Sequence, residues 1–125
     1  MCVLVKILAG KIHRVRITDK HISYIGSITI DPDLIEAAGL HPWQEVLVVN
    51  ENNGNRFYTY IIPGKRGSGQ IILNGPSARL GEVGDIVIIM AFAYIQPGEK
   101  IDPPKVVFVD ENNRIKEIME YKWEG

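Results

Sequence analysis

A glycine followed by a serine interrupts a stretch that otherwise favours a β-strand. The stretch is YIGSITI, residues 24–30, with Gly26 and Ser27 at its centre. Glycine weakens the interior of a strand, so a bulge or a tight turn is the ordinary interpretation of such a pair. Ser27 also carries a nucleophilic hydroxyl, but no nucleophile-elbow pattern points to a serine–histidine–acid triad. The pair must therefore be judged against the other reactive residues of the chain.

Cationic and phenolic side chains recur along two predicted strands. Lys11 and His13 share one strand face, Arg56 shares a face with Tyr60, and Thr59 points the other way. NGPSA, residues 74–78, predicts a turn and a helix start, whose free backbone N–H groups suit an anion. Each feature alone is typical of a strand surface or a turn. Together they indicate a functional site.

Other motifs are weaker. The three histidines and the one cysteine share no ligand spacing, so no metal site is predicted. GKRGSG, residues 64–69, lacks the spacing of a phosphate loop, which favours a mobile surface loop. The basic run over residues 11–16 is interpreted as a solvated strand face, because the formal net charge is −1. No nucleic-acid partner is predicted.

The composition is that of one globular domain spanning residues 1–125, with 46% hydrophobic and 23% charged residues. Cys2 alone cannot form an internal disulfide, so nothing requires an oxidising compartment. The N-terminal run lacks a basic leader and no run is long enough to span a membrane. A cytoplasmic protein without a membrane partner is expected.

Strands dominate the elements that must position these residues. Apolar or alternating runs predict strands over 3–8, 11–18, 44–50, 56–62, 70–74, 85–95 and 105–109. Asn53–Gly54 predicts a hairpin between the third and fourth of these, and the run over 85–95, apolar on both faces, is placed centrally. Asp31 and Gly39 cap a predicted helix, a helical turn is predicted over 76–80, and residues 110–125 are interpreted as a peripheral tail.

A weak internal repeat bears on the fold. AGLHPWQEVLVV, residues 38–49, aligns with ARLGEVGDIVII, residues 78–89, and each copy is a helix end, a loop, an acid and a β-branched strand. Two such units closing against each other favour a small barrel. The pattern is similar to the double-psi β-barrel, which gives a predicted class of mainly β with short helices.

Several separated motifs resemble one enzyme family in order and spacing. They are GKIHRVRIT, YIGSITID, AAGL, NGNRFYTYII, RGSGQIILNGPSA and VGDIVII, which span about residues 6 to 95. The family is that of the pyruvoyl-dependent aspartate 1-decarboxylases, lyases that make β-alanine and CO2 from L-aspartate for pantothenate biosynthesis.

The resemblance implies that the chain is a zymogen that cleaves itself between Gly26 and Ser27. The Ser27 hydroxyl would attack the Gly26 carbonyl, and the resulting ester would eliminate and hydrolyse to a pyruvoyl group, the implied covalent cofactor. Thr59 matches the residue that assists this step and later contacts substrate. The implied products are a β chain, residues 1–26, and an α chain, residues 27–125. Glycine suits the attacked position, because without a Cβ it tolerates a strained backbone.

The resemblance also implies roles in decarboxylation. The pyruvoyl carbonyl would form a Schiff base with L-aspartate and act as the electron sink. Tyr60 matches the proton donor, and Arg56 and Lys11 match residues around the substrate carboxylates. The substrate-binding segment is matched by Gly75, Pro76 and Ser77, and His13, Tyr24 and Asn74 are candidates for supporting roles. A homotetramer with sites between subunits is implied.

One position departs from the family pattern. Small residues usually follow the Asn-Gly pair, whereas here Pro76 has no N–H with which to bind substrate. The alternative to the enzyme is a non-enzymatic barrel that binds a peptide or nucleic acid through its basic strand, with Gly26–Ser27 a mere bulge.

Overall fold

The computed structural model describes residues 2–123 and is mainly β. In these residues the elements are β1 (Val5–Arg16), β2 (Asp19–His21), β3 (Ser27–Ile30), α1 (Pro32–Ala37), β4 (Glu45–Asn50), β5 (Arg56–Pro63), β6 (Ile71–Asn74), the 3₁₀ helix η1 (Gly75–Arg79), β7 (Ile86–Ile95), β8 (Lys105–Val109) and β9 (Ile115–Glu120). The predicted class, mainly β with short helices, is confirmed. No helix among the described residues is long and apolar enough to cross a membrane.

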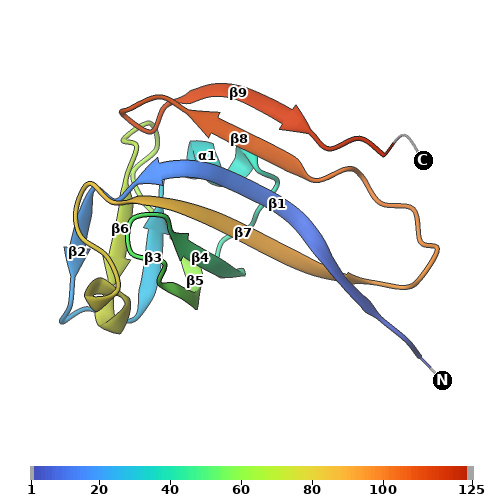
Figure 1. The fold of residues 1–125 in the computed structure, drawn as a ribbon, viewed down its shortest axis with the longest axis horizontal. Helices are drawn as coiled ribbons and strands as arrows, with labels where there is room; N and C mark the ends of the chain where they lie inside the picture. Colours follow the sequence, from blue (N-terminus) through green and yellow to red (C-terminus); the bar gives the residue numbers. More distant parts are fainter. Residues whose placement is uncertain (1, 124–125) are drawn as a thin grey trace.

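The strands form one mixed sheet in the order β2-β6-β3-β5-β4-β7-β1-β8-β9 (Figure 1). β1 leads directly into β2, which pairs with β6 at the far end of this order. Between them the Thr18 N–H donates to the Ile71 carbonyl at 2.8 Å. The β2 end of the sheet is thus joined through one continuous segment to β1, which lies third from the other end of the order, and this closure is consistent with a β-barrel. The double-psi connection stays a prediction.

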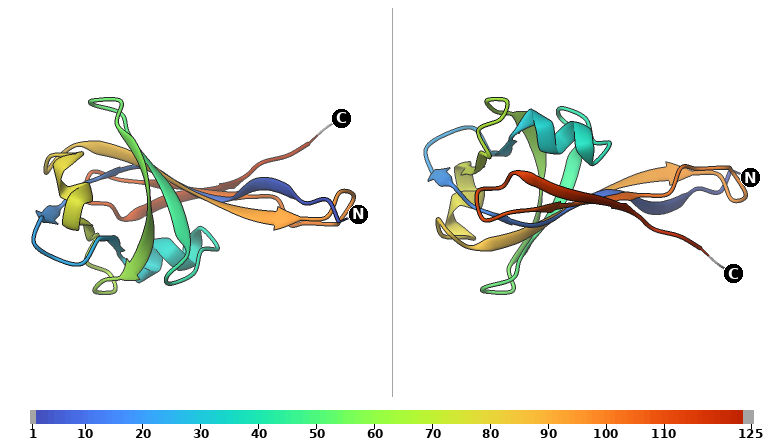
Figure 2. Two further views of the ribbon diagram at one scale, coloured as in Figure 1. Left: turned by 90° about the horizontal axis from the view of Figure 1, so that it is seen from below. Right: turned by 90° about the horizontal axis from the view of Figure 1, so that it is seen from above.

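The core lies inside this curled sheet and is built from alternate strand residues. The largest fully buried side chains are Ile12, Val15, Ile17, Ile28, Ile30, Leu34, Val46, Val48, Ile61, Ile71, Leu73 and Ile89. β7 lies between β4 and β1 near the middle of the order, as its apolar sequence predicts. Beyond the core the outer parts of β1 and β7 extend together as an arm (Figure 2).

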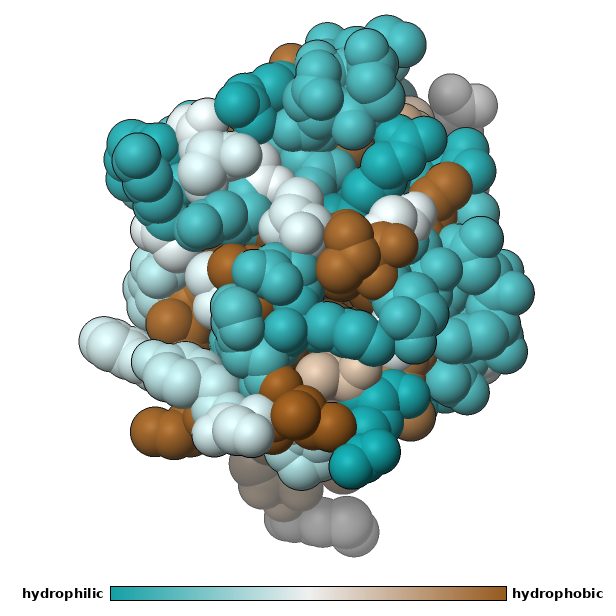
Figure 3. Space-filling view, turned by 90° about the vertical axis from the view of Figure 1, so that its left-hand side faces the viewer, coloured by the Kyte–Doolittle hydropathy of each residue, from teal (hydrophilic) through white to brown (hydrophobic). Residues whose placement is uncertain are grey.

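Exposed apolar side chains lie in the arm and in other parts of the described chain. Val3 and Leu4 just before β1, and Val5 and Tyr94 in the arm, are each more than 40% exposed, and so are residues elsewhere such as Trp43. The end of the molecule that carries β2 and β6 is mostly hydrophilic, with hydrophobic side chains in separate spots (Figure 3). The arm is therefore one of the parts of the described chain that present apolar surface to their surroundings.

The internal repeat corresponds to two neighbouring strands. β4 and β7 pair antiparallel, with Val48 opposite Ile89. The loop before each strand makes the same pair of backbone hydrogen bonds to a third strand segment: Trp43 N–H to Ile61 O and Ile61 N–H to Gln44 O, Gly84 N–H to Ile17 O and Ile17 N–H to Asp85 O. These contacts match Trp43 with Gly84, one residue away from the match in the sequence alignment.

The predicted helix is capped as expected, and its cap organises a second loop. The Asp31 carboxylate accepts a hydrogen bond from Asp33 N–H at 2.9 Å, and Gly39 ends the helix region with φ +71°. The same carboxylate accepts from the N–H groups of Gly67 at 3.0 Å and Gly69 at 2.8 Å. These donors of the GKRGSG loop therefore bind an internal carboxylate, not a phosphate.

Replacing Asp31 by asparagine is expected to lower the free energy of unfolding by about 2–4 kcal/mol, because three backbone N–H groups lose a charged acceptor and one faces an NH2 group. Asp33→Asn is the matched control. Asp33 pairs with Arg66 on the surface at 2.7 Å, so its loss should cost less than about 1 kcal/mol. Urea unfolding of both variants checks this, and equal losses would contradict the assigned role of Asp31.

The C-terminal segment contains structure that the sequence analysis missed. β9 adds an exposed edge strand antiparallel to β8. In the turn before it, Asn113 is only 2% exposed and adopts φ +61°. Its side-chain amide donates to the Arg16 and Gly69 carbonyls, both at 2.8 Å, and accepts from Arg16 N–H at 2.9 Å. The turn is thereby fastened to β1 and to the loop around Asp31.

Other boundaries also differ from the predictions. The two strands predicted over 3–8 and 11–18 form the single strand β1, which continues through a register shift between Leu8 and Gly10. β2 was not predicted. Residues 24–26 are loop, so the Gly26–Ser27 pair does not interrupt a strand: Ser27 begins β3. The strand expected over residues 24–30 is therefore limited to its second half, and the pair lies at the start of that strand and not at a bulge within it.

Candidate active site

A cavity opens beside β5 because β3 does not extend far enough to pair with the first part of that strand. β3 pairs with β5 only from Ile28 opposite Ile61 onward, so residues 57–60 of β5 have no partner on that side. The resulting cavity has a volume of about 480 Å³. Its lining residues are Gly26, Ser27, Glu45, Phe57, Tyr58, Thr59, Tyr60, Asn74, Pro76, Ser77 and Leu80. The predicted cleavage pair thus shares one cavity with Thr59 and Tyr60.

Ser27 is fully buried at the edge of this cavity. Its hydroxyl donates to the Ile25 carbonyl at 3.1 Å and accepts from the Asn74 side-chain N–H at 3.0 Å. Asn74 is opposite Ser27 in the antiparallel pair of β3 with β6 and is itself 2% exposed. A hydroxyl held from two sides in this way has a defined orientation, which a nucleophile requires.

Two glycines pack against each other beside Ser27. Gly75 has φ +68°, and a Cβ on it would lie 2.7 Å from the Gly26 Cα, so no larger residue fits there. Gly26 itself does not have a positive φ, and a Cβ there would make only an ordinary 3.6 Å contact with Pro76. The strain expected at Gly26 is therefore not present, and the crowded position is Gly75.

The 3₁₀ helix η1 forms the floor next to these glycines. Ser77 is buried, and its hydroxyl donates to the Asn74 carbonyl at 2.8 Å, with a longer approach to the Ser27 carbonyl at 3.5 Å. Pro76 lines the cavity through its ring. The predicted segment Gly75 to Ser77 therefore lies at the site, but the Ser77 hydroxyl is already used inside the protein.

Glu45 was missed by the sequence analysis. It begins β4 directly opposite Tyr60 of β5. Among the described residues that line the cavity, Glu45 alone carries a formal charge at neutral pH, so these residues include no cation. The hairpin predicted from Asn53–Gly54 could have revealed Glu45, because a hairpin pairs the residues before its turn with those after it and so brings Glu45 opposite Tyr60.

Lys11 and Arg56 lie outside the cavity. On the outer face of the sheet, Lys11 is opposite Met90, Met90 is opposite Leu47, and Leu47 is opposite Tyr58. Lys11 is thus three strand spacings, about 14 Å, from Tyr58. Arg56 starts β5 as an exposed residue, and Tyr24 is 58% exposed in the loop before Ser27. In the described residues of one chain, Lys11 and Arg56 do not line the cavity, whereas the Tyr24 backbone lies next to Gly75.

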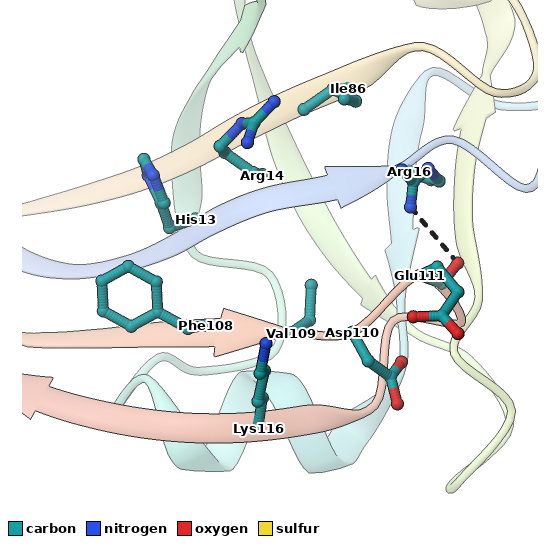
Figure 4. A pocket seen from close by; sticks show the side chains of 9 residues that line it. All are labelled: His13, Arg14, Arg16, Ile86, Phe108, Val109, Asp110, Glu111 and Lys116. Carbon is teal, nitrogen blue, oxygen red and sulfur yellow. Dashed lines mark hydrogen bonds between the residues drawn. The ribbon is translucent and has the colours of Figure 1, made fainter.

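His13 faces a different cavity, of about 420 Å³, together with Arg14, Arg16 and Lys116 (Figure 4). Its ring meets that of Phe108 edge to face with centroids 5.3 Å apart. Burial lowers the pKa of His13, and the positive charges of Lys11 and Arg14 lower that pKa further. Both effects favour the neutral imidazole, and its buried Nδ1 has no hydrogen-bond partner among the described residues.

Comparisons with known proteins identify the family of the chain. The family model described as aspartate decarboxylase matches residues 3–116. The chain is 53% identical over 116 residues to the aspartate 1-decarboxylase of Neisseria meningitidis serogroup C, covering 92% of this chain and 91% of that protein. It is 53% identical over 116 residues to that of Caldicellulosiruptor saccharolyticus, with the same coverage, and 50% identical over 115 residues to that of Geobacillus sp. WCH70, covering 90% of each. The chain belongs to the aspartate decarboxylase family.

Proposed function

We propose that this protein decarboxylates L-aspartate to β-alanine and CO2 for pantothenate biosynthesis, in the cytoplasm, after cleaving its own chain between Gly26 and Ser27. The observation that carries the proposal is the buried Ser27 hydroxyl, oriented by Asn74 and the Ile25 carbonyl at the edge of a cavity. Family membership over residues 3–116 supports it. These findings favour the enzyme over the alternative of a binding module that uses its basic strand.

In the proposed cleavage, the Ser27 hydroxyl adds to the Gly26 carbonyl and Thr59 assists. Ser27 and Thr59 line the same cavity, which supports the assignment of Thr59 to this step. The buried position of Ser27 keeps bulk water from competing for the ester that forms. The residue at position 27 is then converted to the pyruvoyl group.

The residues around Ser27 fit a pyruvoyl group. The group has a ketone oxygen where serine has its amine and a methyl group where serine has its hydroxymethyl group, so it needs a hydrogen-bond donor near that oxygen and no added room. The buried Asn74 amide, which donates to Ser27 Oγ at 3.0 Å, is a donor beside this residue. When formed, the group supplies a reactive carbonyl that captures an amine and withdraws electrons as the carboxylate leaves. Tyr60 lines the same cavity and would give a proton to the substrate carbon that loses CO2.

Recognition of aspartate needs cations that the cavity of one chain lacks. The substrate carries two carboxylates, and the charged residue in the cavity is Glu45, which would repel both. We therefore assign Lys11 of a neighbouring copy and Arg56 to the substrate carboxylates. This assignment agrees with the predicted homotetramer, in which the sites lie between subunits. The distance of about 14 Å between Lys11 and Tyr58 within one chain supports this assignment. The exposed apolar arm offers surface for such contacts.

Substrate binding by backbone groups is expected to differ at one position. Pro76 has no N–H, so Gly75 and Ser77 are the residues of η1 whose backbone can donate to a carboxylate. The predicted supporting roles of His13, Tyr24 and Asn74 differ in how close they lie: Asn74 contacts Ser27, whereas His13 and Tyr24 would act from a neighbouring copy.

Intact-mass spectrometry tests the proposal. The purified protein should consist of fragments 1–26 and 27–125, with the larger lighter by one ammonia than simple hydrolysis would leave it, because serine has become pyruvoyl. Ser27→Ala should stay one chain, since the attacking hydroxyl is gone. A free N-terminal serine on the larger fragment would exclude the cofactor, and an uncut wild-type chain would favour the binding module.

A further inference from the structure

Ser27 and Thr29 share one face of β3 and accept hydrogen bonds from the same amide. Asn74 Nδ2 donates to Ser27 Oγ at 3.0 Å and to Thr29 Oγ1 at 2.9 Å. A side-chain amide nitrogen carries two hydrogens, so these bonds use both. Asn74 is almost fully buried, so its amide cannot turn over without losing both bonds inside the protein. Thr29 Oγ1 is therefore the second acceptor for the NH2 group of Asn74 in the orientation in which that group also faces Ser27.

The orientation of Thr29 is fixed in turn by its methyl group. A Cβ on Gly64 would lie only 2.8 Å from Thr29 Cγ2, so the methyl group occupies space that the glycine leaves open. Threonine is restricted at χ1, and a methyl group held on one side defines where the hydroxyl points. The hydroxyl is thereby directed at Asn74.

We infer that Thr29 is a positioning residue for self-cleavage, which holds the Asn74 N–H on Ser27 Oγ; the inference rests on the proposed function. With the amide turned over, Asn74 Oδ1 would face Ser27 and accept the serine proton in place of the Ile25 carbonyl. Ser27 Oγ would then have no donor. The cleavage has one step in which this donor is needed most.

That step is the elimination. First, Ser27 Oγ bonds to the Gly26 carbonyl carbon, the C–N bond breaks, and the hydroxyl proton passes to the Ser27 nitrogen, leaving an ester. A base such as water then removes the Ser27 Cα proton, the Cβ–Oγ bond breaks, and its electron pair stays on Oγ as part of the Gly26 carboxylate. Water finally converts the dehydroalanine to pyruvoyl and releases ammonia. The Asn74 N–H stabilises the charge that develops on Oγ during elimination.

Three variants of the full chain test the role of Thr29. Thr29→Val keeps the shape but removes the hydroxyl, so pyruvoyl should form about three- to tenfold more slowly, the worth of one buried hydrogen bond. Ester should accumulate, which hydroxylamine traps by releasing a 27–125 fragment with a free N-terminal serine, one ammonia heavier than the pyruvoyl form. Thr29→Ser should retain the wild-type rate. Thr18→Val is the matched control, because the Thr18 hydroxyl bonds to Ile71 at 3.1 and 3.0 Å away from the site and its loss should lower only stability.

The outcomes separate this inference from the proposed function. An uncut wild-type chain overturns both. If the wild-type chain matures, three results would overturn the role of Thr29 alone. They are a Thr29→Val variant that matures as fast as the wild type, a Thr29→Val variant that matures slowly without accumulating ester, and a Thr29→Ser variant that is as slow as Thr29→Val. If Thr29→Val does not fold, Thr29→Ala, which removes the methyl group together with the hydroxyl, is measured by the same two readouts.

Discussion

Replacing Tyr60 by phenylalanine is expected to reduce turnover of L-aspartate by about 10²–10⁴-fold while cleavage at Gly26–Ser27 proceeds. Cleavage as proposed uses the Ser27 hydroxyl, the Gly26 carbonyl and Thr59, none of which needs the phenol. The carbon that loses CO2 must gain a proton, and Tyr60 is the residue proposed to supply it. Phenylalanine keeps the ring, so β5 and its pairing with Glu45 should be preserved.

The measurement combines mass spectrometry of the Tyr60→Phe variant with an assay for β-alanine. Tyr58→Phe is the matched control, because Tyr58 lines the same cavity on the same strand and is not assigned a proton. It should retain nearly full activity. Normal turnover in Tyr60→Phe would remove Tyr60 from the mechanism. An uncut Tyr60→Phe chain would show that self-cleavage also depends on Tyr60.

Replacing Lys11 by alanine is expected to lower kcat/KM for aspartate by about thirty-fold to several thousand-fold, because a substrate carboxylate loses its charged partner. The loss should be far smaller for alanine as substrate, which lacks the second carboxylate. Lys6→Ala is the control on the same strand. Lys6 lies over the rings of Tyr58 and Phe92, at 5.4 and 5.2 Å from their centroids, and is given no substrate role.

Mixing an impaired variant with an inactive one tests where Lys11 acts. If the site combines Ser27 of one copy with Lys11 of its neighbour, co-assembly of Lys11→Ala with Ser27→Ala should restore activity, at about a quarter of the sites for random assembly. Neither variant alone has a complete site. If assemblies that are verified to contain both variants show no recovery of activity, Lys11 must act on the Ser27 of its own chain.

Features set by local backbone preferences were predictable from the sequence. Asp31 and Gly39 were identified as helix caps because side-chain and backbone preferences there act over a few residues. Asn53–Gly54 predicted the β4–β5 hairpin for the same reason, with Gly54 at φ +77°. The run over 85–95 was placed centrally because only a strand covered on both faces can be apolar throughout.

Features that depend on which strands meet were not predictable. Tyr24 and Ile25 have strong strand propensity, yet they lie in a loop, because β6 ends at Asn74 and Gly75 packs directly against Gly26. The cavity itself arises from the unequal lengths of β3 and β5, which no local pattern encodes. β9 consists of exposed residues, so it lacked the alternation by which strands are recognised. The separation of Lys11 from Ser27 follows from strand order.

The place of β1 in the sheet has a consequence for the lifetime of the cut protein. β1 lies within residues 1–26, yet this twelve-residue strand pairs with β7 on one edge and, through residues 10–13, with β8 on the other. A chain cut after Gly26 would therefore be a split protein whose two pieces are held together by non-covalent contacts, namely strand pairing and the shared core. The uncut chain folds in a unimolecular reaction, whereas separated pieces must find each other at their concentration in solution. The lifetime of such a cut form would therefore be set by its rate of unfolding, which is kinetic stability, and not by a refolding equilibrium.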